Sequence, residues 1–202
     1  DERVITSNTE FFLDIQNGAS LLKRLELLGV GIGDRWDSLV EYAERQIDDH
    51  VLSFTDLHSC MTLAAAKKDE AVDRFRTSLT SFADTPDNYC ASITNQIVIP
   101  MCDGIIAFEA GDYVRAVDHL WPLRESWSPI GGSHAQRDIF TQILVDATIQ
   151  AGQLDRARAL LSQRLTVKPQ SAGGWKKYAQ VLNALGAGDK AKLALRRAGN
   201  IH

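Results

Sequence analysis

The sequence contains few of the residues that cross-link, kink or anchor a polypeptide. Its 202 residues include three cysteines and five prolines, and no run of about 18 apolar residues occurs. Cys60, Cys90 and Cys102 are odd in number and widely spaced, which predicts buried free thiols in a reducing compartment rather than disulfides or a paired metal site. The missing apolar run and signal pattern predict a cytoplasmic chain with no transmembrane helix. The chain starts at Asp1 rather than Met, which indicates a fragment or a processed product.

Positive charge is also scarce. Lys and Arg number 22 against 26 Asp and Glu, which gives a net charge of −4 and a pI near 5.7. Nucleic acids and anionic membranes attract proteins that concentrate positive charge on one face, so neither is an expected partner. The one local basic excess, Lys190, Lys192, Arg196 and Arg197, is interpreted as the solvated face of a helix.

Apolar residues recur at helical spacing almost throughout, and strand-like alternation is weak, which predicts an all-α protein. Two adjacent segments match one another at a spacing of 34 residues when Asp138 and Ala172 each take position 1. Position 15 is then a glycine in both segments, where the first helix ends, and position 20 is an alanine, where two helices approach closely. This period resembles the tetratricopeptide repeat.

The sequence therefore predicts a tetratricopeptide-like helical-hairpin solenoid of about five antiparallel helix pairs. Residues 1–15 are expected to be loosely ordered, and residues 16–202 to form a single α-helical repeat domain. Within it, Asp34 is the expected N-cap of the second helix, and Pro100 is expected in the first turn of its helix. The predicted repeat units are 52–85, 97–130, 138–171 and 172–202, and the predicted helix pairs are 17–29 with 34–48, 50–66 with 69–83, 89–110 with 112–126, 134–151 with 153–167, and 172–186 with 188–199.

Four segments carry a more specific resemblance. They read NGASLLKRLELLGVGIGDRW, DDHVLSFTDLH, FEAGDYVRAVDHLWPLR and IGGSHAQRDIF, and they lie between residues 16 and 170. In this order they resemble the tetratricopeptide-repeat protein 38 family, whose members are about twice as long. The resemblance implies that this chain corresponds to the C-terminal half of such a protein, that it is cytosolic, and that no established reaction carries over.

The segment DDHVLSFTDLH brings His50, Asp56 and His58 close together in the sequence. On one straight helix, His50 and His58 would be about 12 Å apart along the axis, too far for a shared metal ion. We therefore expect these side chains to cap helices or to bond between them. A polar binding site is the alternative, and no metal and no cofactor are predicted.

The segment GGSHAQRD has a structural explanation for half of its residues. Ser133 and Gln136 have the spacing of a capping box, in which each side chain bonds to the other residue's backbone N–H. Gly131 and Gly132 would let the chain turn into this helix with positive φ. The glycines, the serine and the glutamine therefore predict the start of a helix.

His134, Arg137 and Asp138 are not explained by the cap. His134 and Asp138 are four residues apart on one helix face and can pair, while Arg137 can pair with Asp103 or Glu109 on the preceding hairpin. A helix start after two glycines can also bind an anion. We therefore retain these three residues as a candidate binding site, with acid–base catalysis by His134 and Asp138 as a further alternative.

The leading functional hypothesis is a scaffold that binds a protein or peptide through its concave face, without catalytic residues. The face could also pack on a missing N-terminal half, and a homodimer is a third alternative. The rival is an enzyme or small-molecule binder with a polar site that gathers His50, Asp56 or His58 with His134, Arg137 and Asp138. In a tetratricopeptide array the concave groove is expected to be lined by Gln142, Asp146, Lys176, Gln180 and Asn183, and in the 97–130 unit by Val98, Met101, Ile105, Phe108 and Glu109.

Overall fold

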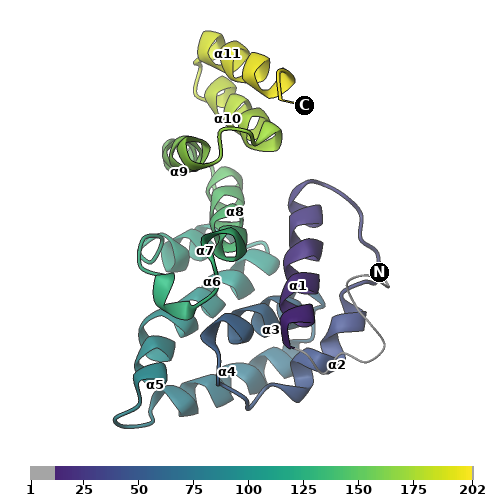
Figure 1. Ribbon diagram of the computed structural model, residues 1–202, viewed down its shortest axis with the longest axis vertical. Coiled ribbons are helices and arrows are strands. Elements are labelled where there is room, and N and C mark those ends of the chain that lie inside the picture. The colour runs from purple at the N-terminus through teal and green to yellow at the C-terminus, as the bar shows by residue number, and fades with distance from the viewer. Residues whose placement is uncertain (1–11, 202) are drawn as a thin grey trace. The chain divides into compact units, whose positions relative to one another are not determined.

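The computed structural model describes residues 12–201, and the regular elements in this range are all helices (Figure 1). The contacts divide the chain into two compact units, unit 1 up to Ile143 and unit 2 from Leu144 onward. The boundary falls inside a helix, and the single repeat domain over residues 16–202 stays a prediction. Helix α1 starts at Phe12, so the predicted loose segment is helical from there, and residues 1–11 of that prediction lie outside the described range.

Unit 1 consists of helical hairpins connected by short turns. α1 packs on α2, α3 on α4, and α6 on α7, as predicted for antiparallel pairs. The second predicted helix is shorter than expected, because residues 33–36 form a turn and the helix starts at Asp37, so Asp34 is not its N-cap. The elements are α1 (Phe12–Leu27), α2 (Asp37–Arg45), α3 (Ser53–Ala65), α4 (Asp69–Ala83), α5 (Tyr89–Ile93), the π-helix η1 (Thr94–Val98), α6 (Ile99–Glu109), α7 (Tyr113–Leu120), the 3₁₀ helix η2 (Ser128–Ile130) and the first part of α8 (His134–Gln150).

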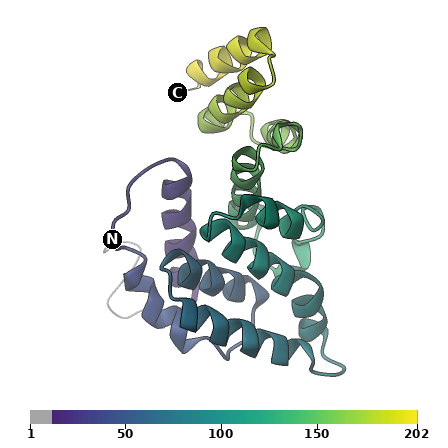
Figure 2. The same cartoon turned by 180° about the vertical axis from the view of Figure 1, so that it is seen from behind.

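Helix α3 is the centre of unit 1. Every residue from Phe54 to Leu63 is buried, because α3 contacts α1, α2, α4 and α6. Figure 2 shows α3 from behind, among the helices that enclose it. A helix that is buried on all sides carries its polar residues into the core, where they must find hydrogen-bond partners. Asp56 and His58 are two of these residues, and this burial determines what they can do.

The repeat glycines end helices in the left-handed conformation. Gly111, Gly152 and Gly186 have φ of 79°, 69° and 76°, and the next residue's N–H bonds five residues back, as in a Schellman motif. In the hairpin α3–α4 the same motif is made by Lys67, with φ of 55°, whose neighbour Lys68 bonds to the Leu63 carbonyl at 3.0 Å. The repeat is faint there in the sequence because a lysine occupies the glycine position.

Pro100 lies in the first turn of α6, as predicted, and α6 itself continues a longer helical segment. α5, η1 and α6 run without a break from Tyr89 to Glu109, and the π-helical turn Thr94–Val98 directly precedes the proline. Because proline lacks an N–H and its ring clashes with the preceding turn, a widened turn is the expected accommodation. This segment has the length and apolar composition of a membrane-crossing helix, with a mean hydropathy of 1.3, yet half of its apolar window is buried in the protein, as in a core helix.

Unit 2 contains the last part of α8, then α9 (Leu154–Val167), α10 (Ala172–Ala184) and α11 (Gly188–Gly199). Its helix boundaries are within about two residues of the predicted ones. α10 packs on both α9 and α11, and Ala179, Leu182, Ala191 and Ala194 form the buried cluster between α10 and α11. Small residues at these positions allow the two helices to approach closely, as the 34-residue period predicts.

Candidate functional site

His50 joins two helices of unit 1 through a chain of hydrogen bonds. Its Nδ1 lies 3.1 Å from Asp56 Oδ1 on α3, and its Nε2 lies 3.0 Å from Ser78 Oγ on α4. Ser78 in turn donates to Asp48 Oδ1 at 2.6 Å. His50 and Asp56 are both buried, and burial raises the pKa of Asp56, opposed by the hydrogen bond and charge of His50. His50 and Asp56 therefore form a hydrogen bond, as expected from the sequence for side chains that bond between elements, with His50 before α3 and Asp56 on it.

A serine, a histidine and an aspartate in this order also occur in acyl-transfer triads. Here Ser78 gives its only proton to Asp48, so His50 Nε2 must donate to Ser78 and has no lone pair left to accept a proton from it. Ser78 also lies in the middle of α4, where backbone N–H groups bond within the helix and cannot stabilise an oxyanion. The arrangement fits a tether that holds the α2–α3 connection to α3 and α4.

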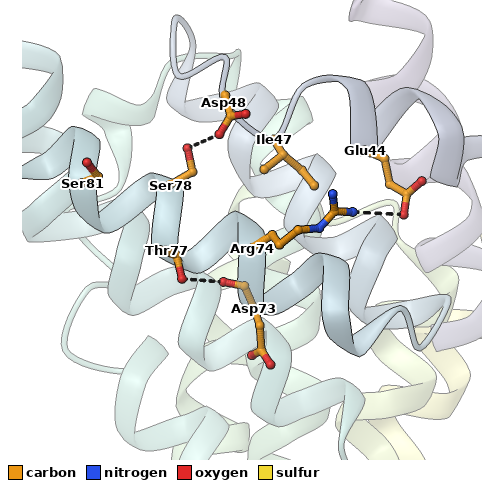
Figure 3. Close-up of a pocket in the computed structure, with 8 residues that line it drawn as sticks. All are labelled: Glu44, Ile47, Asp48, Asp73, Arg74, Thr77, Ser78 and Ser81. Atoms are coloured by element: carbon orange, nitrogen blue, oxygen red, sulfur yellow. Dashed lines mark hydrogen bonds and ion pairs between the residues drawn. The ribbon is translucent and has the colours of Figure 1, made fainter.

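Ser78 and Asp48 line a surface pocket of about 610 Å³ between α2 and α4 (Figure 3). Its charged residues also include Glu44, Asp73 and Arg74, and Arg74 lies 3.6 Å from Glu44. Three carboxylates against one guanidinium make the pocket acidic. No sequence pattern indicated this pocket, because its residues come from two helices 30 positions apart.

His58 forms a second, separate network that is fully buried. Its Nδ1 lies 2.7 Å from the Phe54 carbonyl and its Nε2 lies 2.9 Å from Ser20 Oγ on α1. A carbonyl only accepts, so Nδ1 carries the proton and Nε2 accepts from Ser20. Burial lowers the pKa of His58 to about 4, opposed by the hydrogen bond to Phe54 and assisted by the charge of Arg24. The imidazole is therefore neutral at pH 7 and holds α3 to α1.

A buried lysine is the strongest polar feature that the sequence interpretation missed. Lys23 on α1 is only 2% exposed, and its Nζ lies 2.5 Å from Glu26 Oε2 and 2.7 Å from Glu109 Oε1 on α6. The ammonium also lies 5.2 Å from the ring centre of Trp36. Lys23 and Glu26 continue the helical spacing of the buried residues Ala19 and Leu22, and that position within the apolar stripe was the available signal.

The capping box at the start of α8 is confirmed. Ser133 N donates to Gln136 Oε1 at 2.8 Å, and Gln136 N donates to Ser133 Oγ at 3.3 Å. Gly131 and Gly132 have φ of 91° and 69°, as expected for the turn. A Cβ atom on Gly132 would lie 2.9 Å from the Phe54 ring, so the turn packs closely on α3.

Arg137 bonds to this turn rather than to a carboxylate. Its Nη1 donates to the Gly131 carbonyl at 2.9 Å and also to the Gly132 carbonyl. Both predicted partners are engaged elsewhere, since Asp103 pairs with Arg76 at 2.6 Å and Glu109 pairs with Lys23. Arg137 therefore closes the loop that leads into α8.

His134 and Asp138, which the capping box does not explain, also lie near the start of α8. His134 is exposed, and its Nδ1 lies 3.5 Å from Arg137 Nη2. Asp138 accepts a hydrogen bond from Gln142 at 2.8 Å, and its pairing with His134 stays a prediction. Each predicted cluster thus has its own hydrogen bonds: His50 with Asp56, His58 with Ser20, and His134 with Arg137. Across residues 12–201, no three His, Cys, Asp or Glu side chains are arranged to hold a metal ion.

The predicted groove positions differ between the units. In the 97–130 unit, Val98, Met101 and Ile105 are fully buried, so they belong to the core of unit 1 and cannot line an open groove. Gln142 bonds to Asp138, and Asp146 forms an ion pair with Lys177 at 2.7 Å. The three predicted positions on α10, which are exposed, are Lys176, Gln180 and Asn183.

No family model matches the chain. Among solved structures, the chain is similar to MamA of AMB-1, with a TM-score of 0.52, 21% identity, and coverage of 91% of this chain and 99% of the other. It is also similar to MamA of MSR-1, with a TM-score of 0.50, 19% identity, and coverage of 100% and 97%. The fold therefore defines a tetratricopeptide-like, all-helical repeat protein. The likeness supports the repeat fold but not membership of the tetratricopeptide-repeat protein 38 family.

Proposed function

We propose that this protein is a helical-repeat scaffold that binds a protein or peptide through the exposed face of α10. The observation that carries the proposal is the spacing of Lys176, Gln180 and Asn183, which places three exposed polar side chains on one side of the helix. An adjacent side of α10, with Ala179 and Leu182, packs into the core of unit 2. Repeat proteins use such an arrangement to present a rigid binding surface.

Neighbouring contacts support this use of α10. The ion pair between Lys177 and Asp146 holds α10 against the end of α8, and both residues are only partly exposed. The hydroxyl of Ser171 caps the start of α10 by accepting from Gly174 N at 3.2 Å. A helix fixed at its start and along its length offers side chains at defined positions, which lowers the entropic cost of binding.

The polar-site alternative is not favoured, because its residues form separate hydrogen-bonded networks. We also propose kinship with the tetratricopeptide-repeat protein 38 family, which rests on the four sequence motifs, and a cytoplasmic location. The free thiols Cys60 and Cys102, both buried, are compatible with a reducing compartment, although Cys90 is exposed rather than buried.

The test compares two positions that share a residue type and exposure but lie on different helices. A photo-reactive amino acid is introduced at Gln180 on α10 or at Gln163 on α9, both of which are exposed. We expect a cross-linked protein partner from position 180 and a much lower yield from position 163. Equal yields from the two positions would show that α10 is not the binding surface.

A second measurement uses the captured partner after purification. The triple substitution of Lys176, Gln180 and Asn183 by alanine is expected to weaken binding at least about tenfold, because central contacts dominate binding free energy. The matched control is the triple alanine substitution of exposed residues on α9, Arg158, Gln163 and Thr166. Unchanged affinity in the α10 variant would refute the assignment.

A further inference from the structure

Charge is distributed very unevenly between the two units. Unit 1, residues 1–143, has 23 Asp and Glu against 12 Lys and Arg, a net charge of −11. Unit 2, residues 144–202, has three Asp and Glu against ten Lys and Arg, a net charge of +7. The overall value of −4 therefore conceals two strongly and oppositely charged parts. Such charge governs which partners approach a surface and how fast.

The positive charge of unit 2 is concentrated on its last two helices. From residue 172 to residue 199 the only acidic residue is Asp189, against six Lys and Arg. On α11, Lys190, Lys192 and Arg196 are all exposed. Lys192 and Arg196 are four residues apart and so lie on one face of the helix. We call these two residues the α11 basic surface, and Lys192 there also lies 3.3 Å from Asp189 Oδ1.

Three acidic residues of unit 1 lie around the pocket between α2 and α4. Glu44, Asp48 and Asp73 line it, with Arg74 as its one basic lining residue (Figure 3). All four are exposed, and the pocket volume of about 610 Å³ is within the usual range of binding pockets. This part of unit 1 offers carboxylates in a concave surface that long basic side chains can enter.

We propose that the α11 basic surface docks on the acidic α2–α4 surface of a second copy of this chain. The charge of unit 1 selects this partner over a nucleic acid or an anionic membrane. An extended polyanion that meets unit 2 also meets a unit of charge −11, which repels it. In a second copy the same −11 becomes the attractive charge. The inference goes beyond the proposed function, since it needs no foreign partner and depends on other residues.

Docking of unlike surfaces is heterologous, so each copy retains one unoccupied surface of each kind. Association should then continue beyond a dimer as concentration rises. It should also weaken with salt, because the screening length falls from about 10 Å at 0.1 M to about 3 Å at 1 M. Both properties distinguish it from a closed dimer formed by apolar contact.

The experiment is sedimentation velocity of the full chain at several concentrations, in low and high salt. In low salt we expect mass to increase with concentration, and we expect this increase to disappear in 1 M salt. The double substitution Lys192→Glu and Arg196→Glu should weaken association at least about tenfold. The control, Lys67→Glu with Arg115→Glu, makes the same change in net charge at exposed residues of unit 1 and should not weaken association.

A charge swap completes the test. The α11 double variant mixed with a Glu44→Arg, Asp73→Arg variant should associate again, because the signs are exchanged on both surfaces. A monomer at all concentrations in low salt, or association that neither salt nor the α11 substitutions change, would overturn the proposal. So would binding of double-stranded DNA or phosphatidylserine vesicles that depends on Lys192 and Arg196 while the chain stays monomeric. None of these substitutions or outcomes involves the α10 residues. Failure of this proposal would therefore not affect the proposed binding surface on α10, which the cross-linking experiment tests separately.

Discussion

Lys23 Nζ on α1 lies 2.7 Å from Glu109 Oε1 on α6, and both side chains are largely buried. The same ammonium contacts Glu26, whose other carboxylate oxygen accepts from the Trp36 indole at 2.8 Å. Burial raises the pKa of Glu109, and the charge of Lys23 opposes this. One buried cation thus forms ion pairs with two carboxylates and joins residues that are 86 positions apart in the sequence.

Lys23→Met should destabilise unit 1 by about 3–5 kcal/mol, because the largely buried Glu109 and the partly exposed Glu26 lose their counter-ion. Urea unfolding followed by tryptophan fluorescence measures this loss, since Trp36 lies beside the site. Adding Glu109→Gln to Lys23→Met should recover part of the stability by removing one unpaired charge. A loss below about 1 kcal/mol in the single variant would mean that the ion pairs do not stabilise the fold.

Lys67→Gly should stabilise the protein by about 0.5–1 kcal/mol. Lys67 has φ of 55°, a left-handed conformation that disfavours any residue with a Cβ atom, and it occupies the position that glycine has in the other hairpins. Lys67→Ala is the matched control, because it removes the long side chain and keeps the Cβ atom. Thermal unfolding should show a gain for glycine and none for alanine, and equal effects would exclude backbone strain as the cause.

His58 should make stability depend on pH between about 6.5 and 4. Its pKa is lowered to about 4 in the folded protein, so below pH 6.5 the unfolded chain binds the proton first and stability falls as pH falls. The loss by pH 4 is on the order of 3 kcal/mol. The raised pKa values of Asp56 and Glu109 act in the opposite direction, because a carboxyl with a raised pKa binds its proton first in the folded protein as the pH falls.

The measurement for His58 is urea unfolding at several pH values, with His58→Gln as the comparison. Asp56 and Glu109 are present in both proteins, so their contributions cancel in the difference to a first approximation. We expect the difference in stability between the two proteins to narrow as pH falls from 6.5 to 4. A constant difference across this range would show that His58 does not titrate as its burial requires.

Gly104→Ala should destabilise the α6–α7 hairpin by about 1–3 kcal/mol through overpacking. An added Cβ would lie 2.6 Å from Leu120 Cγ, closer than two carbon atoms can pack. The control, Gly188→Ala, meets no atom within 4 Å and should be neutral or slightly stabilising. Hydrogen exchange in α6 and α7 locates the effect, and protection unchanged from the parent protein would contradict the close crossing.

The sequence by itself predicted the helices, their pairing and the cap of α8. Helical periodicity, the glycines at Gly111, Gly152 and Gly186, and the Ser133–Gln136 spacing are local signals, and local backbone geometry follows from them directly. The local features that the sequence did not predict are a left-handed helix end without glycine and a π-helical turn. Lys67 replaced a glycine, and a π-helical turn directly precedes Pro100.

Tertiary structure alone decided what the polar residues do. The sequence could not predict that Ser78 contacts His50 or that Glu109 contacts Lys23. These partners lie 28 and 86 positions apart and come into contact only when the helices pack. Because α3 is buried on all sides, Asp56 and His58 are hydrogen-bonded groups of the core rather than ligands at an open site. The sequence already contains the excess of negative charge up to residue 143 and of positive charge after it. The contacts show that these two stretches are separate compact units, so each charge belongs to a unit of its own.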